Sequence, residues 1–300
     1  MTRIKIAISG STGFVGKNFV KDLAQDYDIY TIKRNSILDN DHSIFTCDLI
    51  IHLAGNAHDL INTSNPIEYY QVNTELTKKM FDAFIVSNAK VFITISSVKA
   101  VADQVKGILT EDCIPNPITH YGKSKLLAEQ YILSKEIPDG KRFYILRPCM
   151  IHGPGNKGNL NLLYKLVSND IPWPLGAFQN KRSFCSIDNL LFIFKELIER
   201  DDIPSGVYNI ADDEPLSTNE VISLIASSLN KNPKIWNISK GLIQLLAKLG
   251  DVIGLPLNTE RLQKLTESYI VSNQKIKEML RKPLPISTKD GFLNTFESFK

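Results

Sequence analysis

The stretch that decides the fold is IKIAISGSTGFVGKNFV, residues 4–20. Its first six residues are mostly apolar and β-branched, which predicts a buried strand, and the residues that end it have helical periodicity. Between them lie Gly10, Gly13 and Gly16 at three-residue intervals. Missing β-carbons let backbone approach a pyrophosphate, and the N-terminus of the following helix presents unpaired N–H groups to an anion. The stretch therefore predicts a dinucleotide-binding turn, with a purely structural turn as the alternative.

Short β-branched runs alternate with helical patterns through the first half of the chain. Strands are expected at DIYTIK, LIIHLA, VFITIS and RFYILR, and helices at segments such as NTELTKKMFDAFIVSN. This alternation predicts an α/β fold with a Rossmann-type, doubly wound parallel sheet. After LRPCMIHGPGN the pattern loosens, and a helix is expected near 158–169. We expect residues 1–155 to form the NAD(P)-binding domain and 156–300 mainly a smaller C-terminal α/β substrate-binding lobe. Some segments of 156–300 should return to the core, but the strand GVYNIA is assigned to the lobe.

Composition limits the classes of function. The chain has 300 residues with 43% hydrophobic and 22% charged content, as ordinary globular proteins have. Its net charge of +3 includes no long block of one sign, so nucleic acid is not expected as a partner, while anionic small molecules remain open. The cysteines show no paired spacing, which favours buried free thiols in a reducing cytoplasm over a metal site or disulfides; they are Cys47, Cys113, Cys149 and Cys185.

No membrane-spanning segment is expected, because no run approaches the roughly 18 uninterrupted apolar residues that a spanning helix needs. The start of the chain, MTRIKIAISGS, is typical of a strand rather than a signal peptide. The nearest apolar candidate, GLIQLLAKLGDVIGLPL (241–257), is interrupted by Gln244, Lys248 and Asp251. Its helical spacing favours a packed amphipathic helix, with contact to a membrane surface as the less favoured alternative.

The segment THYGKSKLLAEQYILSK (119–135) contains two tyrosines that each precede a lysine by four residues. On a helix such a pair lies on one face, so its phenol and ammonium can meet one ligand. The spacing alone is weak, because it occurs twice here. Tyr121 with Lys125 differs from Tyr131 with Lys135 in being followed by a glycine and in standing 24 residues after Ser97, which closes the strand VFITISS.

Together with this YGKSK segment, the G-x-x-G-x-x-G turn resembles the extended short-chain dehydrogenase/reductases, whose members act largely on nucleotide sugars. IIHLAG, ITISSVK, ILRPCMIHGPG and NKRSFCSIDNL follow in the order of that family, so the resemblance covers nearly the whole chain. Dehydratases of the family resemble S-T-D-E at the serine. Here Val98 and Lys99 follow Ser97, which disfavours dehydration. SSVK is instead similar to bacterial UDP-sugar 4-epimerases and to 4-keto reductases of the quinovosamine pathway.

The resemblance implies that Ser97, Tyr121 and Lys125 converge at a nicotinamide. A phenol with a pKa near 10 needs a neighbouring positive charge to act as a base at neutral pH, which Lys125 would supply, while Ser97 would hydrogen-bond the reacting oxygen. Ser96 is the local rival of Ser97, and a hydroxyl that merely closes a strand is the alternative for both. Asn73 matches an asparagine behind the site or is a surface polar residue. No catalytic role is assigned to His52, His58 or His152, and His52 is expected to pack in the sheet.

The same resemblance implies a set of cofactor contacts, namely Gly10, Gly13, Phe14, Val15, Gly16, Arg34, Leu53, Ala54, Gly55, Tyr121, Lys125 and Pro148. At the end of the second strand, Lys33 and Arg34 stand where an acid would favour NAD, so NADP is expected, with NAD as the alternative. Only fourteen residues separate Arg34 from the strand LIIHLAG. That is too short for the strand and helix usual there, so the adenine side of the pocket is expected to be reduced.

On the substrate side, Arg182 matches the diphosphate-binding arginine of the family, and arginine suits this role through its fixed fork of donors. Arg261 is a second candidate with a surface role as the alternative. Asn159 is expected at the diphosphate or as a helix cap. Leu175, in PWPLG (172–176), is expected near a uracil, unless this segment is only a rigid proline hairpin. Ser97 completes the set.

These residues lead to an NAD(P)-dependent enzyme that reduces the 4-keto group of a UDP-linked deoxy, acetamido hexose for surface polysaccharide. A UDP-hexose or UDP-N-acetylhexosamine 4-epimerase is the alternative, since it uses the same residues. A non-catalytic NADP-binding sensor is the alternative of another class, against which the three converging residues argue. A homodimer through the helix of Tyr121 is compatible with Leu126, Leu127, Ile132 and Leu133, as is an ordinary core face.

Overall fold

A single parallel sheet organises the molecule. The computed structural model describes residues 3–33, 46–56, 65–156, 158–254 and 257–300, so the predicted site residue Arg34 and His58 lie outside the described residues. Six strands are ordered β2 (Asp28–Ile32), β1 (Lys5–Ser9), β3 (Leu49–His52), β4 (Val91–Ile95), β6 (Arg142–Pro148) and β9 (Gly206–Ile210). Every neighbouring pair is parallel, which confirms the predicted doubly wound sheet.

One strand assignment is wrong. Residues 206–210, placed in the smaller lobe by the sequence, pair with β6 as the sixth strand of the main sheet. The reason is that a strand's own pattern records its burial but not its partner. Two later helices also return to the sheet: α8 (Ile187–Glu199) packs into the core shared with β1 and β6, and α12 (Gln274–Leu280) packs against β9.

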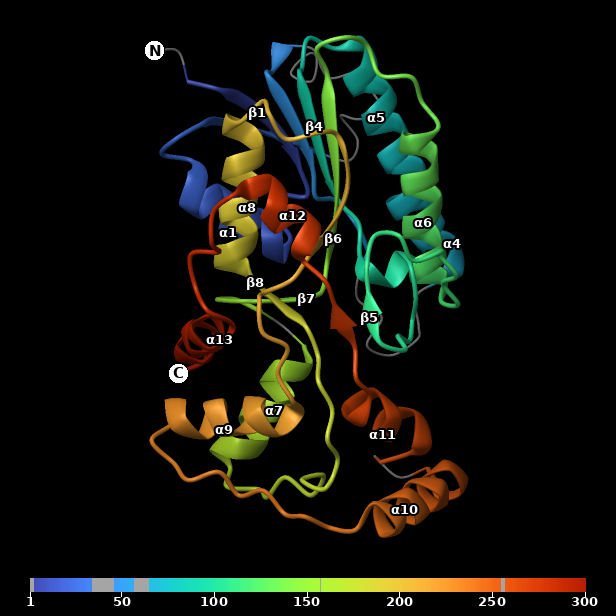
Figure 1. The fold of residues 1–300 in the computed structure, drawn as a ribbon, viewed down its shortest axis with the longest axis vertical. Coiled ribbons are helices and arrows are strands. Elements are labelled where there is room, and N and C mark those ends of the chain that lie inside the picture. Colours follow the sequence, from blue (N-terminus) through green and yellow to red (C-terminus); the bar gives the residue numbers. More distant parts are fainter. Residues whose placement is uncertain (1–2, 34–45, 57–64, 157, 255–256) are drawn as a thin grey trace.

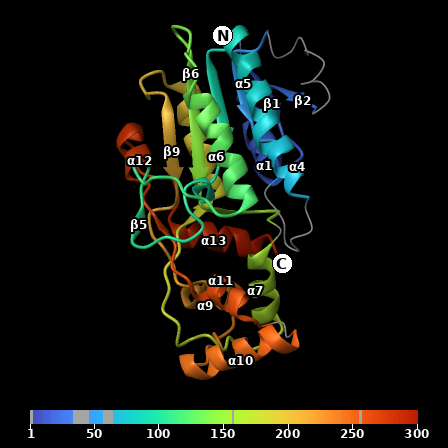
Figure 2. The same ribbon diagram turned by 90° about the vertical axis from the view of Figure 1, so that its right-hand side faces the viewer.

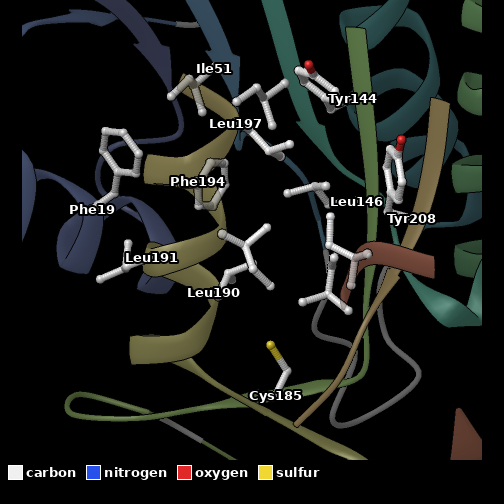
Figure 3. Packing of buried hydrophobic residues seen from close by; sticks show 14 of the residues in the cluster. Phe19, Ile51, Tyr144, Leu146, Cys185, Leu190, Leu191, Phe194, Leu197 and Tyr208 are labelled. Atoms are coloured by element: carbon white, nitrogen blue, oxygen red, sulfur yellow. The ribbon is translucent and has the colours of Figure 1, made fainter. Parts of the chain in front are cut away.

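Alternate residues of the strands supply two separate cores, because successive side chains in a strand point to opposite faces. Ile6 and Ile8 of β1 belong to the cluster that packs with α1 (Phe14–Leu23) and α8, whereas Ala7 belongs to the cluster on the other face. That other face is covered by α5 (Leu76–Val86) and α6 (His120–Leu133), as Figures 1 and 2 show. In Figure 3, Phe194 and Leu190 of α8 point toward Leu146 of β6 and Phe19 of α1.

The sheet order reverses between β1 and β3, and this reversal positions the site. From β1 the chain goes outward to β2, which is the last described strand on its side, and then returns to β3 on the other side of β1. In open α/β sheets, ligands bind at such a reversal, at the carboxyl ends of the strands. No described strand lies beyond β2, in keeping with the short 35–48 segment noted in the sequence.

The smaller lobe lies at the end of the molecule opposite the main sheet and is mainly helical (Figure 1). It contains α7 (Asn159–Ser168), α9 (Thr218–Ser228), α10 (Lys240–Ile253), α11 (Thr259–Thr266) and α13 (Thr288–Glu297). These helices share their own core, which includes Tyr164, Trp173, Ile225 and Phe296. Two small sheets connect the lobe to the main domain, one of β7 (Met150–His152) with β8 (Phe184–Ser186) and one of β5 (Ile108–Leu109) with β10 (Ile270–Val271).

Three expectations about exposure can be compared with the structure. Cys47, Cys149 and Cys185 are buried and outside any disulfide, as predicted, whereas Cys113 is only partly buried. Residues 241–253 of the segment 241–257 form an amphipathic helix, α10, but only part of its apolar surface is packed against the protein. Among the described residues, no helix has both the length and the apolar character that crossing a membrane requires.

Candidate active site

The glycine turn between β1 and α1 has the close backbone contacts expected of a phosphate-binding turn. Gly10 has a φ of +78°, and a β-carbon there would collide with the backbone of Leu53 and Ala54 after β3. A β-carbon on Gly16 would collide with the Gly10 carbonyl. Gly13 is the N-cap of α1, with no capping side chain, and the first turn of α1 contains no acid. The N-terminus of α1 is thus bare, positive and approachable, which fits a pyrophosphate.

The segment after β3 joins this turn to the predicted catalytic lysine. A β-carbon on Gly55 would lie 3.0 Å from Lys125 Nζ and 3.2 Å from Asn73 Oδ1. Asn73 is buried in the π-helical turn η1 (Tyr70–Glu75), donates to Ser124 Oγ and the Asn56 carbonyl, and accepts from the Asn56 N–H. It is therefore not a surface residue. Such π-helical turns are frequent at functional sites.

Lys125 is held at the carboxyl end of β4. Its Nζ donates to the Ile95 carbonyl at 2.9 Å, and the side chain is almost completely buried. Burial lowers the pKa of Lys125 to about 8, against an opposing effect from Glu129. A lysine whose ammonium is this poorly solvated gains from a nearby negative charge or hydrogen-bond acceptor.

Ser97 lies beside the Tyr121 phenol. Burial raises the pKa of Tyr121, and the interaction with the Ser97 side chain lowers it in part. Ser97 is the N-cap of the short helix η2 (Val98–Ala100). A β-carbon on Gly122 would collide with the Lys99 carbonyl, so the glycine after Tyr121 is what lets α6 approach η2 this closely. The same side of α6 therefore presents Tyr121 and Lys125 to one place.

Ser96, the rival of Ser97, serves a different purpose. Its hydroxyl donates to Glu129 on α6, whose carboxylate also forms an ion pair with Arg147 on β6 at 2.5 Å. The Glu129 and Arg147 side chains are 2% and 5% exposed. The sequence analysis did not find this pair. Its only signal was a glutamate four residues after Lys125 and an arginine inside an otherwise apolar strand.

The second tyrosine–lysine pair lies away from the site. Tyr131 OH donates to both carboxylate oxygens of Asp82 on α5, at 2.7 and 2.8 Å. Lys135 Nζ stands 4.6 Å from the centre of the Tyr131 ring. Identical spacing thus gives a surface contact between two helices in one case and a site in the other.

Of the three histidines considered in the sequence, His52 and His152 lie among the described residues, and both have structural roles. His52 is buried in the sheet, where its ring bonds Ser9 Oγ at 2.6 Å and Thr77 Oγ1 at 3.0 Å. Burial, and then Lys125, lower the pKa of His52 to about 3, so it stays neutral at physiological pH. His152 is stacked on Phe292 with a ring separation of 4.1 Å. The prediction that His52 packs in the sheet is confirmed.

Cationic side chains gather between the sheet and the lobe. Arg182 donates to the Lys264 carbonyl of α11 at 2.6 Å, and burial lowers its pKa. Lys99 stands 4.2 Å from the centre of the Tyr269 ring and donates to the Asp103 carbonyl. Burial lowers the pKa of Lys99, the charge of Asp103 opposes this, and the charge of Arg182 lowers it further. Two mutually repelling cations favour an anionic ligand here, and sequence reasoning had not included Lys99 among the site residues.

The other predicted substrate residues differ in accessibility. Asn159 is exposed at the start of α7, but the N-cap is Gly158, so the capping alternative for Asn159 does not apply. Arg261 lies on α11, the helix that holds Arg182. Leu175 is 3% exposed in the core of the lobe, so a contact with a nucleobase remains a prediction for its backbone only.

The segment PWPLG is not a hairpin. Its residues instead form isolated β-bridges with residues 235 and 237, supported by hydrogen bonds from the Trp173 N–H to the Lys234 carbonyl and from the Gly176 N–H to the Trp236 carbonyl. The hairpin alternative for residues 172–176 is therefore wrong.

The remaining predicted cofactor residues surround the glycine turn. Phe14 and Val15 begin α1 and are half-buried, Leu53 and Ala54 follow β3, and Pro148 ends β6 at the same edge of the sheet. Their contact with a cofactor remains a prediction. Because the turn, the bare N-terminus of α1 and Lys125 lie along one edge, this chain has the features needed to hold a dinucleotide with its nicotinamide toward Tyr121.

Comparison with known proteins supports this interpretation. Residues 6–211 match the family described as NAD dependent epimerase/dehydratase family. A UDP-glucose 4-epimerase of Vibrio cholerae is 30% identical over 98% of this chain and 95% of its own length. An N-acetyl-alpha-D-glucosaminyl-diphospho-ditrans,octacis-undecaprenol 4-epimerase of Escherichia coli O157:H7 is 25% identical over 91% of this chain and 84% of its own length.

Solved structures have the same fold. UDP-glucuronic acid 4-epimerase from Bacillus cereus in complex with NAD gives a TM-score of 0.76 at 20% identity, covering 99% of this chain and 96% of that one. RMD from Pseudomonas aeruginosa complexed with NADPH gives 0.73 at 20% identity, covering 98% of this chain and 99% of that one. Neighbours with this fold thus include both NAD and NADPH complexes.

Proposed function

Because this chain belongs to the NAD dependent epimerase/dehydratase family, and is an NAD(P)-dependent enzyme of the extended short-chain dehydrogenase type, we propose that it reduces the 4-keto group of a UDP-linked deoxy, acetamido hexose. The family assignment sets aside the alternative of a non-catalytic sensor. The observation that carries the proposal is the placement of Ser97 beside the Tyr121 phenol, with Lys125 one helical turn further along α6 and held at the end of β4.

Tyr121 is the proton donor in this proposal. Its raised pKa keeps the phenol protonated at neutral pH, which is the form required when a keto oxygen becomes a hydroxyl. Ser97 donates a hydrogen bond to the same oxygen, and the ammonium of Lys125 stabilises the phenolate that is left until solvent restores the proton. A bound nicotinamide supplies the hydride that carbon 4 receives.

The cations between sheet and lobe hold the diphosphate. Arg182 offers several N–H donors and Lys99 a point charge two residues after Ser97, so an anion there lies close to the reacting group. Asn159 and Arg261 extend this surface in the proposal. The choice of NADPH rests on Lys33 and Arg34 and on the absence of an acid at the end of β2.

A 4-epimerase is the second candidate, favoured by the identity of 30% with the Vibrio cholerae UDP-glucose 4-epimerase over nearly the whole chain. Such an enzyme uses Tyr121 first as base and then as acid. The relative in Escherichia coli O157:H7 acts on a sugar carried by diphospho-undecaprenol, so a lipid carrier of the diphosphate is an alternative to uridine.

A panel of sugars separates these functions. The purified chain is given UDP-linked 4-keto-6-deoxy acetamido sugar, UDP-hexoses and UDP-N-acetylhexosamines with NADPH or NADH, while cofactor absorbance is followed and products are identified by NMR. Stoichiometric consumption of NADPH with the keto sugar supports the reductase. Interconversion of gluco and galacto sugars without net consumption supports the epimerase instead, and activity with neither class contradicts both.

Assembly and location are part of the proposal. Leu127 and Leu133 on α6 and Val86 on α5 are exposed on one pair of helices, a surface suited to a homodimer, whereas Ile132 is buried in the core. Light scattering of the wild-type chain and of Leu127→Gln tests this interface, which fails if both are monomers. Free thiols, at four cysteines, favour the reducing cytoplasm.

A further inference from the structure

The exposed side of α10 is the largest feature that the proposed function leaves unexplained. Six large apolar residues on this helix are between 42% and 82% exposed, namely Leu242, Leu245, Leu246, Leu249, Val252 and Ile253. At about 100° per residue they fall within an arc of about 120°. Only Ile243, Ala247 and Gly250 face the protein. The side chains of Lys240, Gln244, Lys248 and Asp251 occupy the remaining arc.

The position of α10 leaves this face open. Figures 1 and 2 show the helix lying across the end of the small lobe, with its axis transverse to the long axis of the molecule. Within the described residues, its main helical neighbour is α11. A helix in this position can lie flat on a surface without moving any other element.

Charge is concentrated around the same helix. Residues 230–264 contain six basic and two acidic side chains. Asp170 pairs with Lys231 and Lys234 of this segment. Residues 230–264 together with Asp170 have a net charge of +3, which equals the net charge of the whole chain. The rest of the chain therefore has a net charge of zero. An apolar helix face within a segment of net positive charge is complementary to an anionic lipid surface.

An exposed tryptophan adds to this. Trp236 is 56% exposed and belongs to the connection between α9 and α10. Figure 1 shows this connection running along the end of the lobe on which α10 lies. Indole rings favour the boundary between lipid and water. The other tryptophan, Trp173, is buried and bonded to Asn219.

From these observations we propose that α10 binds the surface of an anionic phospholipid membrane, lying in its plane with Leu245 and Leu249 inserted among the acyl chains. The lobe that holds the substrate would then face the membrane. This proposal does not depend on the reaction, because it concerns a surface remote from Tyr121 and is tested without activity.

The test is co-sedimentation of the full chain with vesicles of phosphatidylcholine, alone or mixed with phosphatidylglycerol. We expect binding to the mixed vesicles that weakens in high salt. The double variant Leu245→Gln, Leu249→Gln should bind about tenfold less. The matched control Ile67→Gln, Ile114→Gln removes two exposed apolar side chains outside the lobe and outside the proposed dimer surface, and should bind as the wild type does.

Two further measurements complete the test. Trp236 is exposed and Trp173 is buried, so a change in tryptophan fluorescence on adding vesicles reports on Trp236. In the wild type, mixed vesicles should shift the emission to shorter wavelength. The shift should be much smaller in the double variant. Absence of vesicle binding at low salt overturns the proposal, and so does equal binding by the double variant. A wild-type oligomer that becomes monomeric in the double variant, by light scattering, also overturns it, because the face would then contact a second copy of this chain.

Discussion

Replacing Glu129 by glutamine is expected to destabilise the fold far more than the loss of a surface ion pair would. The Glu129 and Arg147 side chains are 2% and 5% exposed, and the guanidinium makes three contacts of 2.5 to 3.1 Å with this one carboxylate. Glutamine has a similar shape but leaves the charge of Arg147 buried without a counterion. Removing one partner of such a pair costs about 3–5 kcal/mol.

That cost is a large part of the total stability of a protein, which is about 5–15 kcal/mol. For a chain of this size it corresponds to a fall in Tm of about 5–8 °C. Urea unfolding and thermal melts of the purified variant measure it. The double variant Glu129→Met, Arg147→Met should recover most of the loss, because an uncharged pair of similar volume has no uncompensated charge.

A matched control comes from the exposed pair of Lys264 with Glu260. Glu260→Gln should change stability far less than Glu129→Gln does, since exposed pairs contribute little. If Glu129→Gln cost no more than Glu260→Gln, or if the double variant were as unstable as the single one, the reasoning about the buried pair would be refuted.

Three other outcomes follow from the site. Burial holds the pKa of Lys125 at about 8 in the folded chain, so between that pH and about 10.4 the unfolded chain binds more protons than the folded chain does. The free energy of unfolding, measured with urea, should therefore rise by about 3 kcal/mol as the pH increases across this window. The Lys125→Met variant should not show this rise. Gly10→Ala should abolish NADPH binding, measured by calorimetry. The control Gly140→Ala has a similar φ of +77° but no atom near the new β-carbon, so it should lower stability by only about 1–2 kcal/mol and retain NADPH binding. Equal effects of the two variants on NADPH binding would contradict the close approach at Gly10. Arg182→Gln should raise KM for the UDP-sugar about tenfold or more with unchanged NADPH affinity, and an unchanged KM would remove Arg182 from the diphosphate site.

The glycine turn and the sheet could be predicted because their signals are local. Strands such as 49–52 are buried on both faces and are apolar up to His52, and Gly10 must be glycine for its φ and for its contact with Ala54. Tyr121 could be distinguished from Tyr131 by the glycine after it, and the structure gives the reason in the contact between Gly122 and Lys99.

Long-range partners could not be predicted in the same way. Glu129, Ser96 and Arg147 lie on three different elements, and nothing in the spacing of one residue specifies the others. The burial of Leu175 depends on its pairing with residues 235–237, some sixty positions later. Likewise β9 carries an ordinary strand pattern, and only the tertiary fold decides that it joins β6.

The central claim is that Tyr121, with Ser97 and Lys125, transfers the proton at carbon 4 of the sugar. Its most direct test compares turnover and NADPH binding of Tyr121→Phe with those of Tyr131→Phe, which removes the same atom from the second tyrosine–lysine pair, at the C-terminal end of α6. We expect Tyr121→Phe to lose turnover by at least about a hundredfold while binding NADPH normally, and Tyr131→Phe to keep both. Undiminished turnover of Tyr121→Phe would contradict the account.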